Sequence, residues 1–374
     1  MSQFLATIPV ALCSAWTILG SAALARLAAT RAPNVAPVLL PAVTVLKPLC
    51  GADPSLEDCL ESFFTQTHPR YELVFGVTDP EDPALAVVER LRARHPEVTA
   101  RVVVHAPPPG QNPKIANLRG MVPYASHDLV LVSDSNVRAP AHYVAAMCAV
   151  AASDPEVGLV STLFVGSGGT GLGSALESVQ LAGFCAAGVA LPTAFGDAAV
   201  IGKSMLFSLA ACERLGGLER LADVLAEDYV LGKMFQHSGR RVVLAPVIIE
   251  NVLGRMTLKA FADRHLRWSM MRFRLRPFAF LLEPLTCPLA VLPFAWALWG
   301  PWALAWAVST LFLRDVVASV SLRGARELHR PMVYGWLRDA VVLVVWALAF
   351  FRKHISWRGH RVRMGAGTLL FAER

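Results

Sequence analysis

The stretch Asp128-Leu129-Val130-Leu131-Val132-Ser133-Asp134-Ser135-Asn136 decides the fold, because an apolar run ends there at a carboxylate. Four consecutive aliphatic residues predict a strand buried on both faces, as in the middle of a parallel sheet. Ligands of open α/β sheets bind outside the carboxyl ends of the strands, so Asp134 is placed to face a ligand through a metal ion. Alternatively, Asp134 and Ser135 cap a helix starting near Pro140. The stretch alone leaves both interpretations open.

The composition indicates a chain that lies partly in a membrane. Only 17% of its 374 residues are charged and its mean hydropathy is +0.47, whereas about a quarter is usual in soluble domains. The net charge is +7, and the basic residues gather at 264–276 and 352–363, beside apolar segments. This favours anionic lipid headgroups, and not nucleic acid, as the partner. Seven scattered cysteines without a Cys-x-x-Cys pair predict neither a disulfide framework nor a zinc site.

An N-terminal membrane anchor is expected over residues 1–31. Phe4–Ala29 is apolar and long enough to span a bilayer, with Arg26 and Arg31 at its end. It is too long for the core of a cleaved signal peptide, so a retained anchor is favoured, with the following chain on the cytoplasmic side. Residues 32–41 then carry three prolines and are typical of a linker.

Two further segments of bilayer length lie near the C-terminus, Leu285–Leu313 and Val333–Phe351. The first is broken by Gly300-Pro301 and is either one tilted span or a tight pair of shorter helices. The loop 314–330 and the tail 352–363 are both basic, and a single span between them cannot place both inside. The expected number of spans after the α/β region is therefore two or three.

Between these segments, short apolar runs alternate with helix-sized amphipathic patterns. The runs predict strands at 43–46, 72–77, 99–105, 128–133, 156–165 and 241–249, and a turn and strand at 196–207. The patterns predict helices at 54–66, 83–94, 113–124, 140–152 and 226–237, a glycine-rich flexible loop at 166–173, and a buried or interfacial helix at 174–195. This alternation predicts an α/β fold with βαβ units, right-handed connections and a mainly parallel, Rossmann-like sheet. No GxGxxG or P-loop is present, so the phosphates of a nucleotide must be held by other means.

A basic helix is predicted from Lys259 to Arg276. Its arginines, Arg264 and Arg267 among them, interleave with Phe, Leu, Trp and Met, which is typical of a helix in the membrane interface. The alternative is a solvated amphipathic helix. Acidic residues also occur at the ends of predicted elements. Asp82, Asp134 and the pair Glu227-Asp228 come before this basic helix, in that order. Each acid alone has a local explanation as a turn or helix-start residue.

Taken together, these residues resemble membrane-bound GT-A glycosyltransferases and are most similar to the ceramide glucosyltransferases. The matching residues are Asp82 in Thr-Asp-Pro-Glu-Asp-Pro, Asp134 in Ser-Asp-Ser, Asp228 in Ala-Glu-Asp-Tyr, and Arg264, Arg267 and Trp268 in Arg-x-x-Arg-Trp. The likeness also includes Leu46-Lys47-Pro48-Leu49, Asn112-Pro113-Lys114-Ile115 and Ile355-Ser356-Trp357-Arg358. The organisation it implies is an anchor at 1–31, a GT-A domain at 42–257, a basic interfacial region at 258–284, transmembrane helices at 285–351 and a basic tail at 352–374.

Transfer of a sugar from a nucleotide diphosphate needs charge stabilisation on the leaving diphosphate and a base for the acceptor hydroxyl. A divalent ion, Mn²⁺ or Mg²⁺, on Asp134 would supply the first, and Arg264 and Arg267, one helical turn apart, can face one phosphate together. Asp228 is the expected general base. One base without a carboxylate nucleophile implies a single displacement with inversion, which gives a β-glycoside.

Other assignments are less direct. The resemblance implies that Asp82 hydrogen-bonds the uridine and that Trp268 belongs to the donor-binding motif. Lys114 either reaches the nucleotide or is a solvated lysine, and Glu227 is expected to cap its helix. Many GT-A enzymes have Asp-x-Asp where this chain has Asn136, so a metal ion is expected to be held mostly through the donor.

The resemblance implies a UDP-sugar, UDP-glucose, as donor and the primary hydroxyl of a membrane lipid, ceramide, as acceptor. Transfer of N-acetylglucosamine to a hopanoid polyol, a processive polysaccharide synthase, an inactive membrane scaffold and a transporter are the alternatives. The region 174–203 is a candidate for lining the path of the lipid, with a plain packed helix as the alternative.

Overall fold

The opening stretch forms strand β4 (Leu129–Ser133) inside an eight-stranded sheet, which confirms the predicted α/β fold. The computed structural model describes residues 3–33, 36, 39–197, 199–324, 328–357 and 360–372. The strand order is β3-β2-β1-β4-β7-β6-β8-β5. The other strands are β1 (Val43–Pro48), β2 (Tyr71–Val77), β3 (Ala100–Val104), β5 (Val137–Arg138), β6 (Val157–Ser167), β7 (Ser204–Ser208) and β8 (Arg241–Val252).

The sheet is mainly parallel, as predicted, and β7 is an antiparallel strand within it. This strand runs antiparallel to both β4 and β6, and the short β5 runs antiparallel to β8. The chain leaves β6 at its carboxyl end, forms helices there and re-enters the sheet at Ser204, opposite Ser133. Because the chain re-enters the sheet at the same end of the strands from which β6 leaves it, β7 must run antiparallel to β6.

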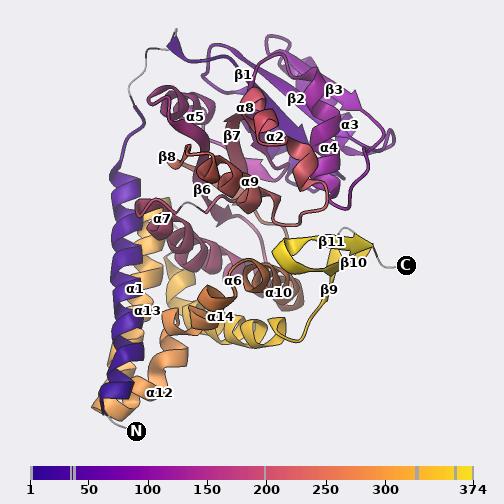
Figure 1. Cartoon of the computed structure of the whole chain (residues 1–374). Helices are drawn as coiled ribbons and strands as arrows, with labels where there is room; N and C mark the ends of the chain where they lie inside the picture. Colours follow the sequence, from indigo (N-terminus) through magenta and orange to yellow (C-terminus); the bar gives the residue numbers. More distant parts are fainter. Residues whose placement is uncertain are drawn as a thin grey trace.

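Helices cover both faces of this sheet, as Figure 1 shows. Helices α2 (Leu56–Phe64), α3 (Ala84–Arg94) and α5 (Tyr143–Ala152) pack with one face, and α4 (Pro113–Met121) and α9 (Glu227–His237) with the other. Strand β4 contributes Leu131 to the first core and Val130 and Val132 to the second. Alternate residues of a strand point to opposite faces, so this strand is buried on both sides, as its apolar run predicts.

The glycine-rich segment after β6 is shorter than predicted, because β6 extends to Ser167 and helix α6 (Leu172–Gln180) begins five residues later. Helix α6 continues through a π-helical turn (Leu181–Cys185) into α7 (Ala186–Ala194). Of the two interpretations of this helical region, burial decides for the packed one: 78% of its apolar window is inside the protein.

Four helices are long and apolar enough to cross a membrane among the residues that the structure describes. They are α1 (Gln3–Ala29), the α6–α7 helix, α13 (Trp302–Arg323) and α14 (His329–Ala349). A bent pair of α11 (Pro277–Leu282) with its 3-10 turn η5 (Glu283–Thr286) and α12 (Pro288–Trp299) could make a fifth. Helices α1, α12 and α13 lie side by side in a bundle that projects from the α/β part (Figure 1). The break at Gly300-Pro301 therefore separates a pair of helices that pack on each other.

The segments on either side of helix α14 both contact the α/β part or the basic helix beside it. The predicted loop 314–330 is wrong up to Arg323, which ends α13 and donates a hydrogen bond to the Ser178 hydroxyl at 2.7 Å. After α14, Arg274 donates to the carbonyl of Arg352 at 3.0 Å. Arg330, in the first turn of α14, donates to the carbonyl of Gly168 at 3.4 Å, and α14 runs crosswise to α1 in Figure 1.

Charged residues inside α13 and α14 are paired with each other. Arg314 and Arg338 each bond to both Asp315 and Asp339 at 2.8–3.1 Å, and all four side chains are buried. Charges in an apolar segment are costly unless they are paired, so this network fixes α14 against α13.

The C-terminal residues form a small sheet of β9 (His354–Trp357), β10 (His360–Met364) and β11 (Leu370–Ala372). It packs beside α10 (Leu258–Leu275) and reaches the segment before α9, where Leu370 N donates to the carbonyl of Asp223 at 2.7 Å. Of the tail residues in the predicted likeness, Arg358 lies outside the described residues.

Candidate functional site

A polar cavity of about 610 Å³ opens at the carboxyl end of β4, where the sequence predicts a ligand site. Six of the seven predicted site residues line it: Lys114, Asp134, Asp228, Arg264, Arg267 and Trp268. They come from the start of α4, the end of β4, the start of α9 and one face of α10. The predicted residues that share this cavity lie up to 154 positions apart in the chain, from Lys114 to Trp268.

Asp134 lies between two lysines. Lys114 Nζ is 3.0 Å from Asp134 Oδ1, and Lys203 Nζ is 2.9 Å from Oδ2. Burial raises the pKa of Asp134, but the charges of Lys114 and Lys203 outweigh burial and hold its pKa well below the ordinary value. Asp134 is therefore an anion at neutral pH. The helix-cap interpretation is not supported, because the next helix begins at Tyr143 with no side-chain cap.

Lys47 fixes the backbone behind Asp134. It lies in β1, is fully buried, and donates from Nζ to the carbonyl oxygen of Asp134 at 2.6 Å, with its ammonium 3.7 Å from the centre of the Phe63 ring. Burial lowers the pKa of Lys47 to about 7. A lysine inside an otherwise apolar strand was the signal in the sequence that this residue contacts a special feature.

Lys114 is held in the cavity and is not a solvated lysine. Asn112 caps α4 by accepting from the amides of Lys114 and Ile115 at 3.0 and 3.1 Å, which orients the first turn of the helix. Lys114 Nζ then reaches Asp134 and, at 3.1 Å, Glu227 Oε1. Glu227 does not cap α9 as expected, because no side-chain cap is formed there, and it pairs with Lys114 instead.

Asp228 is set in place by backbone amides. Its Oδ2 accepts from Gly202 N at 2.5 Å and its Oδ1 from Tyr229 N at 2.7 Å. Burial, with the neighbouring charge of Glu227, raises the pKa of Asp228 to about 7. A carboxylate whose pKa lies near neutral pH is suited to accept a proton during a reaction at that pH.

Helix α10 presents the Arg-x-x-Arg-Trp residues to the same cavity. Arg264 Nη1 bonds Glu177 Oε1 at 3.0 Å, whereas Arg267 has no ion pair or hydrogen bond with the residues that the structure describes. Burial and the repulsion of Arg264 lower the pKa of Arg267. Two arginines at a cavity wall whose charge is not fully neutralised are suited to bind an anion. Trp268 packs edge-on against His265, with ring centres 5.1 Å apart.

Glu177 is a site residue that the sequence reasoning missed. It lies in α6, is fully buried, and accepts from Arg264 and from His265 Nε2 at 2.6 Å. It thus joins two consecutive residues of the motif on α10 to a helix that packs under it. The signal was available, because a single acid in a long apolar stretch usually has a functional or pairing role. Lys203, at the end of the candidate lipid path 174–203, is a second such residue, because it forms an ion pair with Asp134.

Asp82 is the one predicted residue that does not line the cavity. Its carboxylate accepts from Gly51 N at 2.9 and 3.1 Å and from Ala84 N at 2.8 Å, so it ties the start of α3 to the loop after β1. Cys50, which precedes Gly51, does line the cavity. Asp82 therefore borders the site through this loop, and its contact with a uridine stays a prediction.

A divalent cation fits this site only together with a bound diphosphate. Among the described residues, no group of three or more His, Cys, Asp or Glu side chains could hold a metal ion. Asp134 offers one carboxylate, and the amide oxygen of Asn136 accepts from Lys203 at 2.8 Å. Magnesium is commonly bound through one or two carboxylates with substrate phosphates and water supplying the other ligands. Asp134 meets that requirement and no more.

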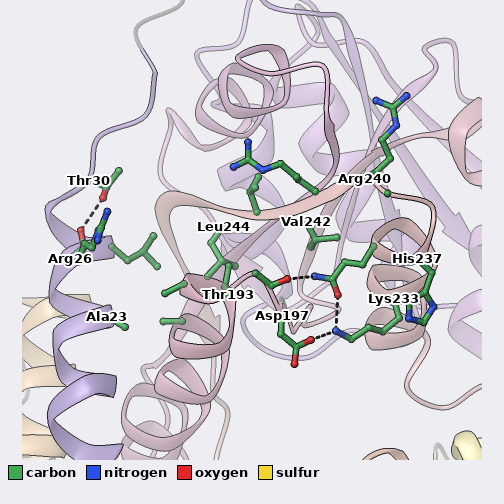
Figure 2. Close-up of a pocket in the computed structure, with 18 residues that line it drawn as sticks. Ala23, Arg26, Thr30, Thr193, Asp197, Lys233, His237, Arg240, Val242 and Leu244 are labelled. Carbon is green, nitrogen blue, oxygen red and sulfur yellow. Dashed lines mark hydrogen bonds and ion pairs between the residues drawn. The ribbon is translucent and has the colours of Figure 1, made fainter. Parts of the chain in front are cut away.

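A larger cavity of about 810 Å³ lies between α1, α7, α9 and β8, and none of the predicted site residues lines it. Figure 2 shows Asp197 bonded to Lys233 on its wall, with Arg26 of α1 across from them. The charged groups on this wall already have partners within the protein: besides the Asp197–Lys233 pair, Arg241 is paired with Asp154 and Arg240 donates to the carbonyl of Pro155. Size alone therefore does not identify the site.

Comparison of the sequence with known proteins shows the family of this chain. The model of glycosyl transferase family 21 matches residues 5–370. The chain belongs to this family. It is 29% identical over 246 residues to ceramide glucosyltransferase 1 of Caenorhabditis elegans, covering 66% of this chain and 53% of that protein. Ceramide glucosyltransferase 3 of the same organism is 29% identical over 255 residues, covering 66% and 54%. The chain thus spans about half the length of these two relatives. The predicted resemblance is confirmed.

A family 21 member is expected to have a GT-A fold, and a solved structure agrees. The mannosyltransferase PcManGT from Pyrobaculum calidifontis, solved with GDP-Man and Mn²⁺, superposes with a TM-score of 0.52 at 21% identity and covers 93% of this chain and 99% of its own. This similarity shows the fold. The GT-A class with apolar helices near both ends, predicted from the sequence, is confirmed.

Proposed function

We propose that this family 21 protein transfers glucose from UDP-glucose to the primary hydroxyl of ceramide, with inversion at the anomeric carbon. The observation that carries the proposal is the placement of Asp134, Asp228 and the two arginines of α10 around one cavity. A base, an anion-binding group and an acid for a cation are the parts that sugar transfer from a nucleotide diphosphate requires. The names of the relatives in Caenorhabditis elegans support a lipid acceptor.

The cations of the cavity would bind the diphosphate of the donor. Arg267 has no partner among the described residues, and Arg264 faces the cavity from the same side of α10, one turn earlier. Guanidinium groups bind phosphate oxygens with two parallel hydrogen bonds, and such bonds strengthen as the leaving diphosphate gains charge. Lys114 and Lys203 add positive charge beside Asp134. Trp268 completes the wall, and Asp82 would act on the uridine end through the loop at Gly51.

Asp228 would remove the proton of the acceptor hydroxyl. The hydroxyl oxygen forms a bond to the anomeric carbon, the bond from that carbon to the diphosphate breaks, and the proton moves to Asp228. One displacement inverts the configuration, so an α-linked donor gives a β-glycoside. A pKa near 7 leaves a useful fraction of Asp228 ionised at neutral pH.

Asp134 would hold a divalent cation, Mn²⁺ or Mg²⁺, when the donor is bound. Such a cation supplies positive charge to the diphosphate as it leaves. Lys114 and Lys203 hold the Asp134 carboxylate in position and ionised.

The proposed organisation keeps the predicted boundaries: an anchor at 1–31, the GT-A domain at 42–257, the basic region at 258–284, membrane helices at 285–351 and the tail at 352–374. We place the GT-A domain on the cytoplasmic face, because the basic end of α1 and the basic residues of α10 would meet anionic headgroups there.

An assay with radiolabelled donors tests the proposal. The purified protein in detergent should transfer label to ceramide from UDP-glucose and not from UDP-N-acetylglucosamine, and a hopanoid should not be labelled. Asp228→Asn should still bind UDP but lose about 10²–10⁴-fold in kcat. Asp128→Asn is a matched control, since Asp128 accepts two hydrogen bonds at the opposite end of β4. Normal turnover by Asp228→Asn would show that another group is the base.

A further inference from the structure

A second cavity, mostly apolar, lies beside the polar one. It has a volume of about 480 Å³, within the range of about 300–1,000 Å³ usual for small-molecule sites. Its walls are aliphatic and aromatic side chains from the membrane helices and the chain between them. They include Leu12, Trp16, Phe184, Pro192, Phe280 and Leu285.

This apolar cavity shares its walls with the polar cavity in three places. On α9, Asp228 lines the polar cavity and the next residue, Tyr229, lines the apolar one. On α10, Met271 faces the polar cavity and Arg272 the apolar one. The base is therefore one residue from the wall of a cavity that suits hydrocarbon.

The third shared wall is the segment between α7 and β7. Ala199 lines the apolar cavity, and Ile201 and Gly202 line the polar one. The sequence points to region 174–203 as a candidate path for the lipid, and its residues reach both cavities.

Charged side chains on the wall of the apolar cavity are neutralised. Arg272 donates two hydrogen bonds to Glu283, at 2.6 and 3.1 Å, and its guanidinium lies 5.5 Å from the centre of the Phe184 ring. Arg276 bonds to Asp197 at 2.6 Å. Paired charges and stacked guanidinium groups present little free charge to a ligand. The cavity is thus suited to an uncharged, flexible chain.

The cavity also borders exposed apolar side chains of α1 and α11. Leu12 on α1 and Leu282 on α11 line it and are 49% and 59% exposed, and Phe278 on α11 is 82% exposed. Exposed aliphatic and aromatic side chains on helices of this kind belong in bilayer hydrocarbon. A lipid chain can therefore reach the cavity from the membrane without crossing water.

We propose that this cavity binds a hydrocarbon chain of the lipid acceptor and so places the acceptor hydroxyl at Asp228. The inference rests on the proposed function for the identity of the acceptor. It assigns the residues that select a lipid over a soluble alcohol, namely the apolar wall from α1, the α6–α7 helix and α11. The polar head of the lipid then lies at the Asp228–Tyr229 step, between the two cavities.

Gly188 offers a way to fill the cavity without disturbing its frame. It lines the cavity from α7, and no atom lies within 4 Å of the position that an added Cβ would take. In Gly188→Leu the new side chain should displace part of a bound chain, and each displaced methylene should weaken binding about fourfold. Gly254→Leu is the control, because Gly254 also has open space around its Cβ but lies outside the cavity.

The test compares a long-chain with a short-chain ceramide in mixed micelles. Gly188→Leu should raise KM for the long-chain ceramide by about tenfold or more, while KM for UDP-glucose and for the short-chain ceramide stays unchanged. Gly254→Leu should match the unaltered protein. An unchanged KM for the long-chain ceramide in a folded Gly188→Leu protein would overturn the proposal.

A second measurement needs no turnover and no variant. A ceramide with a diazirine in its acyl chain should cross-link the unaltered protein at Leu12, Trp16, Phe184 or Leu282, and excess ceramide should suppress the labelling. Labelling confined to the outer surfaces of α12 and α13 would overturn the proposal. If the protein transfers no sugar to ceramide but is labelled in the cavity, the proposed function fails and the lipid site stands.

Discussion

Glu177→Gln separates the role of this residue in stability from its role in holding the Arg-x-x-Arg-Trp motif. Glu177 is fully buried and accepts hydrogen bonds from Arg264 at 3.0 Å and His265 at 2.6 Å. Glutamine keeps the volume of the side chain and one acceptor but removes the charge. A bond to a charged group contributes about 1.5–3 kcal/mol and a neutral one about 0.5–1.5, so neutralising the carboxylate costs about 1 kcal/mol a bond.

The expected loss of stability is thus about 2 kcal/mol. The share of Arg264 lies at the lower end, because its side chain is 31% exposed and partly screened by water. The effect on function should be larger than this loss implies. Arg264 without its anchor no longer faces the diphosphate in one orientation, and a misplacement of about 1 Å can cost about 10²-fold. We expect kcat/KM for the donor to fall about 10- to 100-fold.

The assay combines UDP titration calorimetry, thermal unfolding in detergent and kcat/KM for UDP-glucose. Glu72→Gln is the matched control: Glu72 is buried at the start of β2 and bonds to Thr44, Ser126 and Arg101, far from the cavity. Both variants should unfold at lower temperature, and only Glu177→Gln should bind UDP more weakly. Unchanged UDP affinity and kcat/KM in Glu177→Gln would refute the reasoning.

The pH profile and the C-terminal sheet give two further predictions. Because burial and Glu227 raise the pKa of Asp228 to about 7, kcat/KM should rise tenfold per pH unit up to about 7 and then level off, and Glu227→Gln should move this limb to lower pH. Between the ordinary carboxyl pKa of about 4 and about 7, Asp228 binds a proton in the folded state but not in the unfolded state. This group therefore lowers the stability of the protein as pH rises through that window. A kcat/KM profile that levels off at about pH 4 to 5 would contradict the assignment of Asp228 as the base. Thr368 accepts from Ala226 N, at the start of α9, at 3.2 Å, so Thr368→Val should leave a buried amide unpaired, cost about 1–3 kcal/mol of stability and lower kcat; unchanged thermal unfolding and kcat would contradict this.

The strands and the acids at their ends could be predicted because the signal is local. An apolar run that stops at Asp134 specifies a buried strand and its carboxyl end without knowledge of any other residue. The same holds for the break at Gly300-Pro301, since both residues end helices in most contexts. The direction of β7 could not be predicted, because its neighbours β4 and β6 are set by the path of the chain and not by its own residues.

The partners of distant side chains could not be read from the sequence either, even where a residue was conspicuous. The sequence shows Glu177 as an isolated acid, but not that it meets Arg264, 87 positions later. Likewise the sequence shows Lys114 and Glu227 but not the ion pair between them. That pair rules out a solvated lysine at 114 and a helix cap at 227. Side chains choose partners by proximity, and proximity between helices is decided by packing.

By itself, the sequence determined the class of fold and the family, and it predicted which residues would carry the chemistry, because apolar periodicity and motif spacing are properties of the chain. Only the tertiary structure decided that Asp134 lies between two lysines, that Glu177 anchors the motif on α10, and that an apolar cavity begins one residue from Asp228. These depend on which surfaces come together when the core packs. Charge, burial and distance at a site exist only after that packing, which is why they could not be read along the chain.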